Sequence, residues 1–249
     1  MSTARTRCLE SVDILVLGGG LGTRIRPVLG DTPKLLAPIC GRPYLAHLLD
    51  WLRRYGARRV VLGLGHQAQM ILEHLRADPV RDLELVPVVE PLPLGTAGAI
   101  RFARNELHSD PVLVMNGDSF TSADLCEFVA RHGEARLSGA AASILCAEVD
   151  DASRYGRVEI DDAGWIIRFV EKDPNISADA FVSAGVYLLS ASLITQIAAG
   201  KVSSLEREVF ERLPPRSLAA FCGRFAFIDI GTPESLARAG AIFGVGAAS

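Results

Sequence analysis

The sequence predicts an α/β fold in which helices cover both faces of a mixed, mostly parallel sheet. In the first half of the chain, short apolar runs alternate with segments whose apolar residues recur at helical spacing. The first of these runs ends in a glycine-rich loop, as strands do in folds that bind ligands at the carboxyl edge of the sheet. In the second half, strand-like runs follow one another directly. We therefore expect a Rossmann-like, three-layer architecture.

The first elements form a βαβ unit. Residues 13–17 are an almost wholly apolar run, leucines recur at helical spacing over residues 43–55, and residues 60–64 are a second apolar run. Gly56 follows the helical segment as a stop signal. A parallel pair of strands with a right-handed crossover is expected from this order.

The alternation continues through the middle of the chain and then changes. Helices are expected over residues 67–76, 96–105 and 122–132, and strands over residues 83–89, 111–115 and 140–147. Later strands are expected over residues 156–160, 165–170, 181–189 and 225–228, and later helices over 190–198, 204–213 and from Pro233. The turn sequence Asp161-Asp162-Ala163-Gly164 predicts a hairpin between the first two later strands.

Composition excludes several classes of protein. The 249 residues are 49% apolar and 22% charged, with a net charge of −3, which disfavours disorder and a nucleic-acid partner. No apolar run approaches the roughly 20 residues that span a bilayer, and the N-terminal segment lacks the apolar stretch of a signal peptide. We expect a cytoplasmic protein with no membrane partner.

The cysteines and histidines show no metal-binding or disulfide pattern. The five cysteines are scattered, odd in number and without a CxxC pair, so reduced thiols are expected rather than a disulfide framework or a zinc site. They are Cys8, Cys40, Cys126, Cys146 and Cys222. The five histidines lack HExxH spacing, and most are expected to be surface or hydrogen-bonded residues.

The glycine loop reads Gly18-Gly19-Gly20-Leu21-Gly22-Thr23-Arg24. Glycines let a backbone approach a ligand closely and present successive N–H groups to an anion. A Walker A string and a GxSxG elbow are absent, and the GxGxxG fingerprint fails because Thr23 and Ile25 stand where it needs glycine. An NAD(P)-dependent oxidoreductase is thus disfavoured, while a tight turn that only packs strand on helix stays possible.

Two cations flank the loop, Arg24 and Lys34. Together they could hold a triphosphate and stabilise the charge that develops as pyrophosphate leaves. Taken singly, each fits a solvated surface cation better.

Two aspartates follow strands. Asp118 ends the string Asn116-Gly117-Asp118, and Asp229 follows the late strand. Two carboxylates with phosphate oxygens are a usual way to hold Mg²⁺. An aspartate after a strand is otherwise a helix cap or turn residue, and Asp124 is assigned to this class as an acid in the first turn of the following helix.

The string over residues 93–99 predicts the start of a helix. Thr96 could cap this helix, and the helix N-terminus could face a base or a phosphate. Glu90, just upstream, could accept hydrogen bonds from guanine N1 and N2, or be a solvated loop residue.

The string GGxGTR, followed after a short gap by PK, resembles the signature of the sugar-1-phosphate nucleotidyltransferases. Further strings of that family stand in order from Ile14 to about Ala239: Asn116–Asp118, Arg154-Tyr155-Gly156, Glu171-Lys172, a Ser183-Ala184-Gly185 segment where the family has NAG, and the IDIGTP string around Asp229. The resemblance implies one nucleotidyltransferase domain over residues 1–249, with a nucleotide-binding part at about 12–130 and a sugar-binding part at about 140–240.

The resemblance also implies the reaction and the residues that serve it. A sugar 1-phosphate attacks the α-phosphorus of a nucleoside triphosphate, and pyrophosphate leaves, with Mg²⁺ as cofactor. The implied catalytic residues are Arg24, Lys34, Asp118 and Lys172, and the metal ligands are Asp118 and Asp229. The implied nucleotide-binding residues are Leu17, Gly18, Gly19, Gly20, Gly22, Thr23, Glu90, Gly95 and Thr96. The implied sugar-phosphate residues are Asn116, Gly156, Glu171, Lys172 and Ser183.

Among shorter members, the chain most resembles the D-glycero-D-manno-heptose 1-phosphate guanylyltransferases. The cues are residues 94–99, 152–156 (ASRYG) and 204–210 (SLEREVF). GTP and a heptose 1-phosphate are therefore the expected partners, and a homo-oligomer is compatible with the sequence. Mannose-1-phosphate guanylyltransferase, a thymidylyl- or uridylyltransferase for another sugar, and a non-catalytic nucleotide-sugar sensor are the alternatives.

Overall fold

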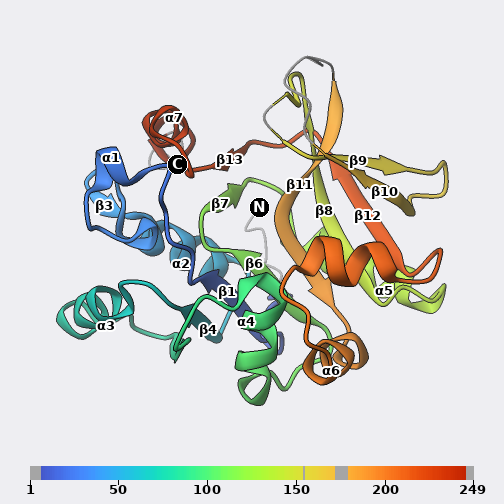
Figure 1. Ribbon diagram of the computed structural model, residues 1–249, viewed down its shortest axis with the longest axis horizontal. Helices are drawn as coiled ribbons and strands as arrows, with labels where there is room; N and C mark the ends of the chain where they lie inside the picture. The colour runs from blue at the N-terminus through green and yellow to red at the C-terminus, as the bar shows by residue number, and fades with distance from the viewer. Residues whose placement is uncertain (1–6, 154, 172–178, 245–249) are drawn as a thin grey trace, which may run out of the picture.

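A nine-stranded mixed sheet forms the centre of the computed structural model, which describes residues 7–153, 155–171 and 179–244 (Figure 1). In spatial order its main path is β10 (Ile166–Val170), β9 (Arg157–Ile160), β11 (Ala180–Leu189), β6 (Val112–Asn116), β1 (Ile14–Gly18), β4 (Arg59–Leu64) and β5 (Glu84–Val89). Off this path, β8 (Ala142–Val149) pairs with β11, and β12 (Leu218–Gly223) pairs with β8. The α/β fold predicted from the sequence is confirmed.

Helices lie on both faces of this sheet. The helices on these faces are α2 (Tyr44–Arg54), α3 (Ala68–Ala77), α4 (Gly95–Ala103), α5 (Leu125–Leu137) and α6 (Ala191–Ala199). Helices α1 (Arg26–Leu29) and α7 (Pro233–Gly244) lie away from the main sheet (Figure 1), and short 3-10 turns are η1 (Lys34–Leu36) and η2 (Arg104–Glu106). Successive residues of a strand point to opposite faces. Ile14 and Val16 accordingly pack in the core that contains α2, α3 and α5, while Leu15 packs in the core that contains α4 and α6.

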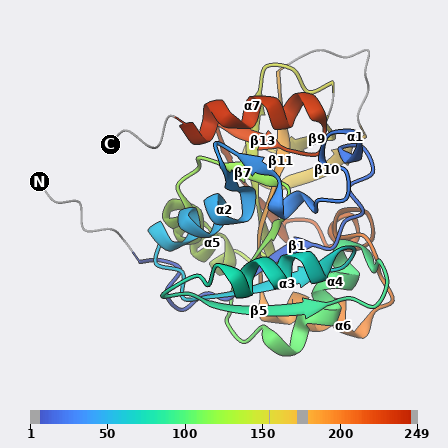
Figure 2. The ribbon, with the colours of Figure 1, turned by 90° about the vertical axis from the view of Figure 1, so that its left-hand side faces the viewer.

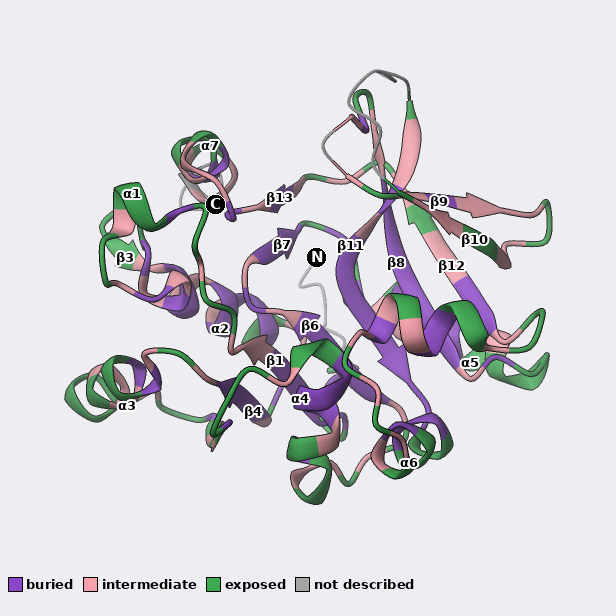
Figure 3. Ribbon diagram, viewed as in Figure 1, coloured by how far each residue is buried: buried purple, intermediate pink, exposed green. Residues whose placement is uncertain are grey.

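Buried residues follow the central strands, and exposed residues gather on the outer sides of the helices (Figure 3). This pattern explains why the strands of the parallel half read as continuous apolar runs, since both of their faces are covered. Helices α6 and α7 lie at opposite ends of the molecule, with the sheet between them (Figure 2). Within the described residues, no helix is long and apolar enough to cross a membrane.

Strand β1 pairs in parallel with β4 on one side and β6 on the other. The register places Leu17 opposite both Gly63 and Asn116. The carboxyl ends of β1 and β6 therefore lie side by side, so the loop after Gly18 and the residues after Asn116 face the same edge of the sheet.

The second half of the chain adds antiparallel pairs. Strand β11 pairs with β6 and β8, and its register with β8 shifts between Ser183 and Tyr187. Within this irregular stretch Gly185 has a φ of 69°, and a Cβ atom there would lie 2.6 Å from Asn116 Nδ2. A glycine is thus needed where β11 passes the end of β6. Strands β9 and β10 form the predicted hairpin.

Some elements differ from prediction. The helix expected over residues 204–213 is a π-helical segment, η3 (Leu205–Val209), followed by a 3-10 turn, η4 (Phe210–Arg212). Strand β12 and the small pair β2 (Pro38–Ile39) and β3 (Arg42–Pro43) were not predicted. The late strand is β13 (Phe227–Asp229), which pairs with an unpredicted strand, β7 (Ser119–Thr121). Such short strands have too few residues to show a period.

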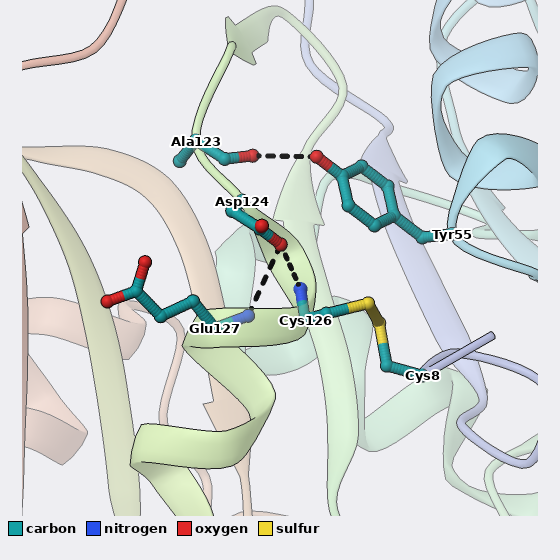
Figure 4. Close-up of a disulfide and its surroundings, with 6 residues drawn as sticks. All are labelled: Cys8, Tyr55, Ala123, Asp124, Cys126 and Glu127. Atoms are coloured by element: carbon teal, nitrogen blue, oxygen red, sulfur yellow. Dashed lines mark hydrogen bonds between the residues drawn. A yellow bond between two sulfur atoms is a disulfide. The ribbon is translucent and has the colours of Figure 1, made fainter. Parts of the chain in front are cut away.

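The cysteine prediction is wrong for one pair. Cys8 and Cys126 form a disulfide that ties the segment before β1 to the first turn of α5 (Figure 4). The two cysteines are 118 residues apart, so their spacing carried no sign of the bond, and only the fold brings them together. Cys40, Cys146 and Cys222 are free. At the start of the same helix, Asp124 accepts hydrogen bonds from the N–H groups of Cys126 and Glu127, so it is the N-cap of α5 rather than an acid inside its first turn.

His132 is the exception to the histidine prediction. It is buried on α5, where its Nδ1 lies 2.8 Å from Ser143 Oγ. Its Nε2 atom has no hydrogen-bond partner in the part of the chain that the structure describes. Burial is the main reason that the pKa of His132 falls to about 4.

Candidate active site

In the glycine loop after β1, some glycines pack closely against other residues and others leave space for a ligand. A Cβ atom at position 18 would lie 2.5 Å from Leu35 Cδ1, and Gly22 has a φ of 62°. A Cβ atom at Gly20, in contrast, would meet no atom within 4 Å. The positive φ favours glycine at position 22, and a side chain at position 18 would have to displace Leu35, whereas the backbone at Gly20 is open to a ligand.

A cavity of about 300 Å³ lies beside this loop. Six of the predicted nucleotide-binding residues line it: Leu17, Gly19, Gly20, Glu90, Gly95 and Thr96. Asn116 and Asp118, at and just after the end of β6, line it as well. Gly22 and Lys34 line a separate, smaller hollow beside the loop. Gly18 and Thr23 do not line the 300 Å³ cavity.

Glu90 is a buried wall of this cavity rather than a solvated loop residue. Only 8% of its surface is exposed, and its Oε2 accepts a hydrogen bond from the Leu94 N–H at 3.1 Å. Burial raises the pKa of Glu90, and the Leu94 hydrogen bond partly opposes that rise. Its carboxylate lies against Gly19 of the loop, so it spans from the loop to the start of α4.

Thr96 does not cap α4, contrary to prediction. The N-cap position belongs to Leu94, so Thr96 already lies in the first turn, where its hydroxyl instead accepts a hydrogen bond from Leu205 N at 2.8 Å. The Ala97 N–H donates to Ser203 O at 2.9 Å. The start of α4 is thereby anchored on segment 203–209, which also reaches the second cavity described below.

A charged cluster stands at the edge of the first cavity. Lys34 Nζ donates to Asp118 Oδ2 at 2.7 Å, and both side chains are largely buried. Strands β7 and β13 pair so that Asp229 lies opposite Ser119, the neighbour of Asp118. The Ile230 N–H then donates to Asp118 O at 2.8 Å. The structure thus unites three of the predicted catalytic and metal-binding residues.

The two carboxylates are close enough to affect each other. Burial raises the pKa of Asp229, and the negative charge of Asp118 raises it further, while the Gly231 N–H, Lys34 and Arg24 act in the opposite direction. A Cβ atom at Gly231 would lie 3.4 Å from Arg24 Nη2, so the guanidinium of Arg24 reaches this cluster too. Two repelling carboxylates are a site that a divalent cation would stabilise.

The donor set fits Mg²⁺ better than a metal that needs an all-protein cage. Among the described residues, no group of three or more His, Cys, Asp or Glu side chains could hold a metal ion. Mg²⁺ is commonly held by one or two carboxylates together with substrate phosphates and water. Asp118 and Asp229 are such a pair.

A second cavity, of about 230 Å³, lies between β9, β10, β11 and segment 203–209. It brings together the predicted sugar residues Gly156, Glu171 and Ser183. Asn116 lines the first cavity instead, although it touches β11 at Gly185. Lys172 lies outside the described residues, so its position stays a prediction.

Three further residues of this second cavity region were missed. Arg207 pairs with Glu171 at 2.5 Å on the surface, and Tyr187 donates a hydrogen bond to Glu206. Glu206 and Arg207 belong to the SLEREVF string, which served only as a cue to the subgroup, so a signal was present but was assigned no role. A larger cavity of about 450 Å³, between α5 and β12, contains none of the predicted site residues.

The sequence profile of the family described as Nucleotidyl transferase matches residues 14–243. Mannose-1-phosphate guanylyltransferase of Mycobacterium tuberculosis is 32% identical over 239 residues, covering 93% of this chain but only 64% of that protein. D-glycero-alpha-D-manno-heptose 1-phosphate guanylyltransferase of Campylobacter jejuni is 30% identical over 224 residues, covering 88% of this chain and 95% of that protein.

Solved structures share the fold. The crystal structure of HddC from Yersinia pseudotuberculosis superposes with a TM-score of 0.83 at 31% identity, covering 93% of this chain and 99% of that one. A second structure of HddC, complexed with GMP-PN, matches equally well. The profile match over nearly the whole chain, together with this common fold, shows that the chain belongs to the nucleotidyl transferase family.

Proposed function

We propose that the chain transfers a guanylyl group from GTP to a sugar 1-phosphate, giving a GDP-sugar and pyrophosphate. The observation that carries the proposal is the Lys34–Asp118–Asp229 cluster at the edge of a cavity walled by the glycine loop, Glu90 and the start of α4. In this proposal the first cavity receives the nucleotide and the second receives the sugar.

Guanine is supported by the chemistry of Glu90. Guanine presents two neighbouring donors, N1–H and the N2 amino group, and a carboxylate is an acceptor that can receive both. One oxygen of Glu90 is held by Leu94, which orients the side chain at the cavity wall. The guanylyltransferase names of two relatives and the GMP-PN complex of HddC support the same base.

D-glycero-α-D-manno-heptose 1-phosphate is the acceptor we propose first. The Campylobacter jejuni relative carries that substrate in its name and is matched over 95% of its length. The mannose-named relative is slightly more similar, at 32% against 30% identity, but is matched over only 64% of its length, so mannose 1-phosphate is the second candidate.

The chemistry needs positioning and charge stabilisation more than proton transfer. An oxygen of the sugar 1-phosphate forms a bond to the α-phosphorus as the bond from that phosphorus to the departing pyrophosphate breaks. This nucleophile is already anionic, so no general base is required. Arg24 and Lys34 would neutralise the phosphates of GTP, and Lys172 would bind the sugar phosphate as a point charge. Asp118 and Asp229 would hold Mg²⁺, which supplies positive charge to the triphosphate when bound.

The test is pyrophosphate release with Mg²⁺, screening four nucleoside triphosphates against hexose and heptose 1-phosphates. We expect GTP with the heptose 1-phosphate to give the highest kcat/KM. A clear preference for mannose 1-phosphate would correct the sugar, and a preference for another base would correct the role of Glu90. If a nucleotide sugar binds but no pair releases pyrophosphate, the protein is a sensor rather than an enzyme.

A further inference from the structure

We infer that Glu206 binds hydroxyl groups of the sugar and that Tyr187 and Ser183 orient it for this task. This inference rests on the proposed function, because it assigns a substrate-binding residue to the second cavity. No motif used in the sequence analysis gave Glu206 a role.

A chain of hydrogen bonds leads from β11 to Glu206. Ser183 Oγ donates to the Tyr187 hydroxyl at 3.3 Å, and that hydroxyl donates to Glu206 Oε1 at 3.0 Å. Tyr187 is only 3% exposed, and burial together with the Glu206 carboxylate raises its pKa well above the ordinary value. The phenol therefore stays protonated and holds one oxygen of Glu206 in a fixed direction.

This chain changes what Ser183 can do for a sugar. A hydroxyl has a single proton, and that of Ser183 is directed to Tyr187, while its oxygen accepts from the Gly185 N–H at 3.3 Å. Ser183 stands where the family sequence has Asn, a residue with two side-chain donors. The cavity wall at Ser183 therefore offers no free side-chain donor, and the acceptor linked to it through Tyr187 is the Glu206 carboxylate.

The backbone of Glu206 is also held firmly. Ser204 Oγ accepts from the Arg207 N–H at 3.2 Å, and Thr96 accepts from the Leu205 N–H. The Glu208 carboxylate accepts hydrogen bonds from Ser203 and Ser204, which lower its pKa to about 2. The same segment thus anchors both the nucleotide side, through Thr96, and the sugar side, through Glu206.

Glu206 retains a free acceptor toward the cavity. It lines that cavity with Gly156, Glu171 and Ser183, and within the described residues its Oε2 accepts no hydrogen bond and no cation pairs with it. Its neighbour Arg207 is instead paired with Glu171. A carboxylate with one oxygen fixed and the other free suits a pair of neighbouring sugar hydroxyls, both of which donate. The ligand class is therefore a sugar that presents a vicinal diol at this wall.

The experiment compares Glu206→Gln with wild type, using whichever sugar 1-phosphate the wild type prefers. Hydrogen bonds to a charged group contribute enough that we expect KM for the sugar 1-phosphate to rise about tenfold or more. KM for GTP should change by less than about twofold, because the base and phosphates lie in the other cavity. Glu159→Gln, an exposed carboxylate on β9 outside this cavity, controls for the loss of one negative charge and should leave both constants unchanged.

Deoxy sugar phosphates give a readout that a purely structural role would not change. Removing the contacted hydroxyl should weaken binding to wild type but have little further effect on Glu206→Gln. Tyr187→Phe removes the orienting donor, so it should raise the same KM by a smaller factor. If Glu206→Gln lowers the melting temperature strongly, Glu206→Asp replaces it in the same test. This variant keeps the charge but shortens the side chain by one methylene.

The outcomes separate this inference from the proposed function. If wild type releases pyrophosphate and Glu206→Gln keeps its KM for the sugar 1-phosphate, the inference is wrong and the function stands. If wild type releases none, the function fails, and calorimetry with GDP-mannose and GDP-heptose decides the inference. Weaker binding to Glu206→Gln than to Glu159→Gln would then uphold it, while equal affinity, or no binding to wild type, would overturn it.

Discussion

Lys34 Nζ donates a 2.7 Å hydrogen bond to Asp118 Oδ2, joining the segment after the glycine loop to the end of β6. In this arrangement the lysine charge is directed to a carboxylate that would also hold Mg²⁺. In the proposed function, Mg²⁺ would become a partner of Asp118 and the phosphates of GTP would become partners of Lys34. The ion pair thus holds both side chains in place and neutralises their charges in the absence of substrate. This avoids the free-energy cost of burying either charge without a partner.

Asp118→Asn tests the metal assignment directly. We expect turnover to fall by a factor of about a thousand or more, since loss of a charge that positions the catalytic cation removes transition-state stabilisation. The fold should persist, because asparagine keeps the shape and a hydrogen-bonding oxygen. Pyrophosphate release and circular dichroism measure the two effects. Activity like that of wild type would refute the role of Asp118.

Asp124→Asn is the matched control for that variant. Asp124 lies six residues further on and caps α5, and its side chain is exposed. Asparagine is also a good N-cap residue, so stability should change by well under about 1 kcal/mol, and turnover should not change.

Glu90→Gln tests base recognition. Glutamine retains one acceptor oxygen but brings an amide donor against the guanine N2 amino group, so kcat/KM for GTP should fall about ten- to a hundredfold. ITP, which lacks the N2 amino group, should lose less. Equal losses for GTP and ITP would place the guanine edge away from Glu90.

Stability should depend on pH through His132. Burial first, and Arg136 second, lower its pKa to about 4 from 6.5, with Asp110 acting in the opposite direction. The unfolded chain therefore binds a proton near pH 6.5 that the folded chain does not bind until about pH 4. The free energy of unfolding should fall as pH falls through this window, by about 3 kcal/mol in total at 1.36 kcal/mol per pKa unit.

Urea unfolding at several pH values from 6.5 to 4.5 measures this effect. His132→Gln should make the stability curve flatter over that range, whereas His108→Gln, which removes an exposed histidine, should leave its slope unchanged. If the pH dependence of the free energy of unfolding is unchanged in His132→Gln, other groups cause the loss of stability at acid pH.

The Cys8–Cys126 disulfide should be detectable by counting thiols. In denaturant without reductant, three thiols should react, those of Cys40, Cys146 and Cys222. Closing so long a loop stabilises a fold by about 2–5 kcal/mol, so reductant should lower the melting temperature of wild type but not of Cys126→Ser. Five reactive thiols before reduction would show that the bond is absent.

Local patterns predicted the parallel half of the fold well. The strand expected over residues 13–17 is β1 at Ile14–Gly18, and the helix expected over residues 43–55 is α2 at Tyr44–Arg54. Both carry their evidence in neighbouring residues, through apolar runs and helical spacing. Segment 204–213 was predicted to be an α-helix because Leu205 and Val209 have helical apolar spacing. In the structure the Leu205 N–H is bonded to Thr96 of α4, and residues 205–209 form a π-helical turn.

By itself, the sequence determined the class of fold, the place of the glycine loop after β1, and the identity of most residues that line the first cavity. Only the tertiary structure decided that β7 and β13 pair to bring Asp229 beside Asp118, that Thr96 binds Leu205, that Cys8 joins Cys126, and that Tyr187 directs Glu206. The physical reason is distance along the chain. Periodicity and turn chemistry act over a few residues, whereas these contacts join segments that meet only when the sheet has formed and its helices have packed.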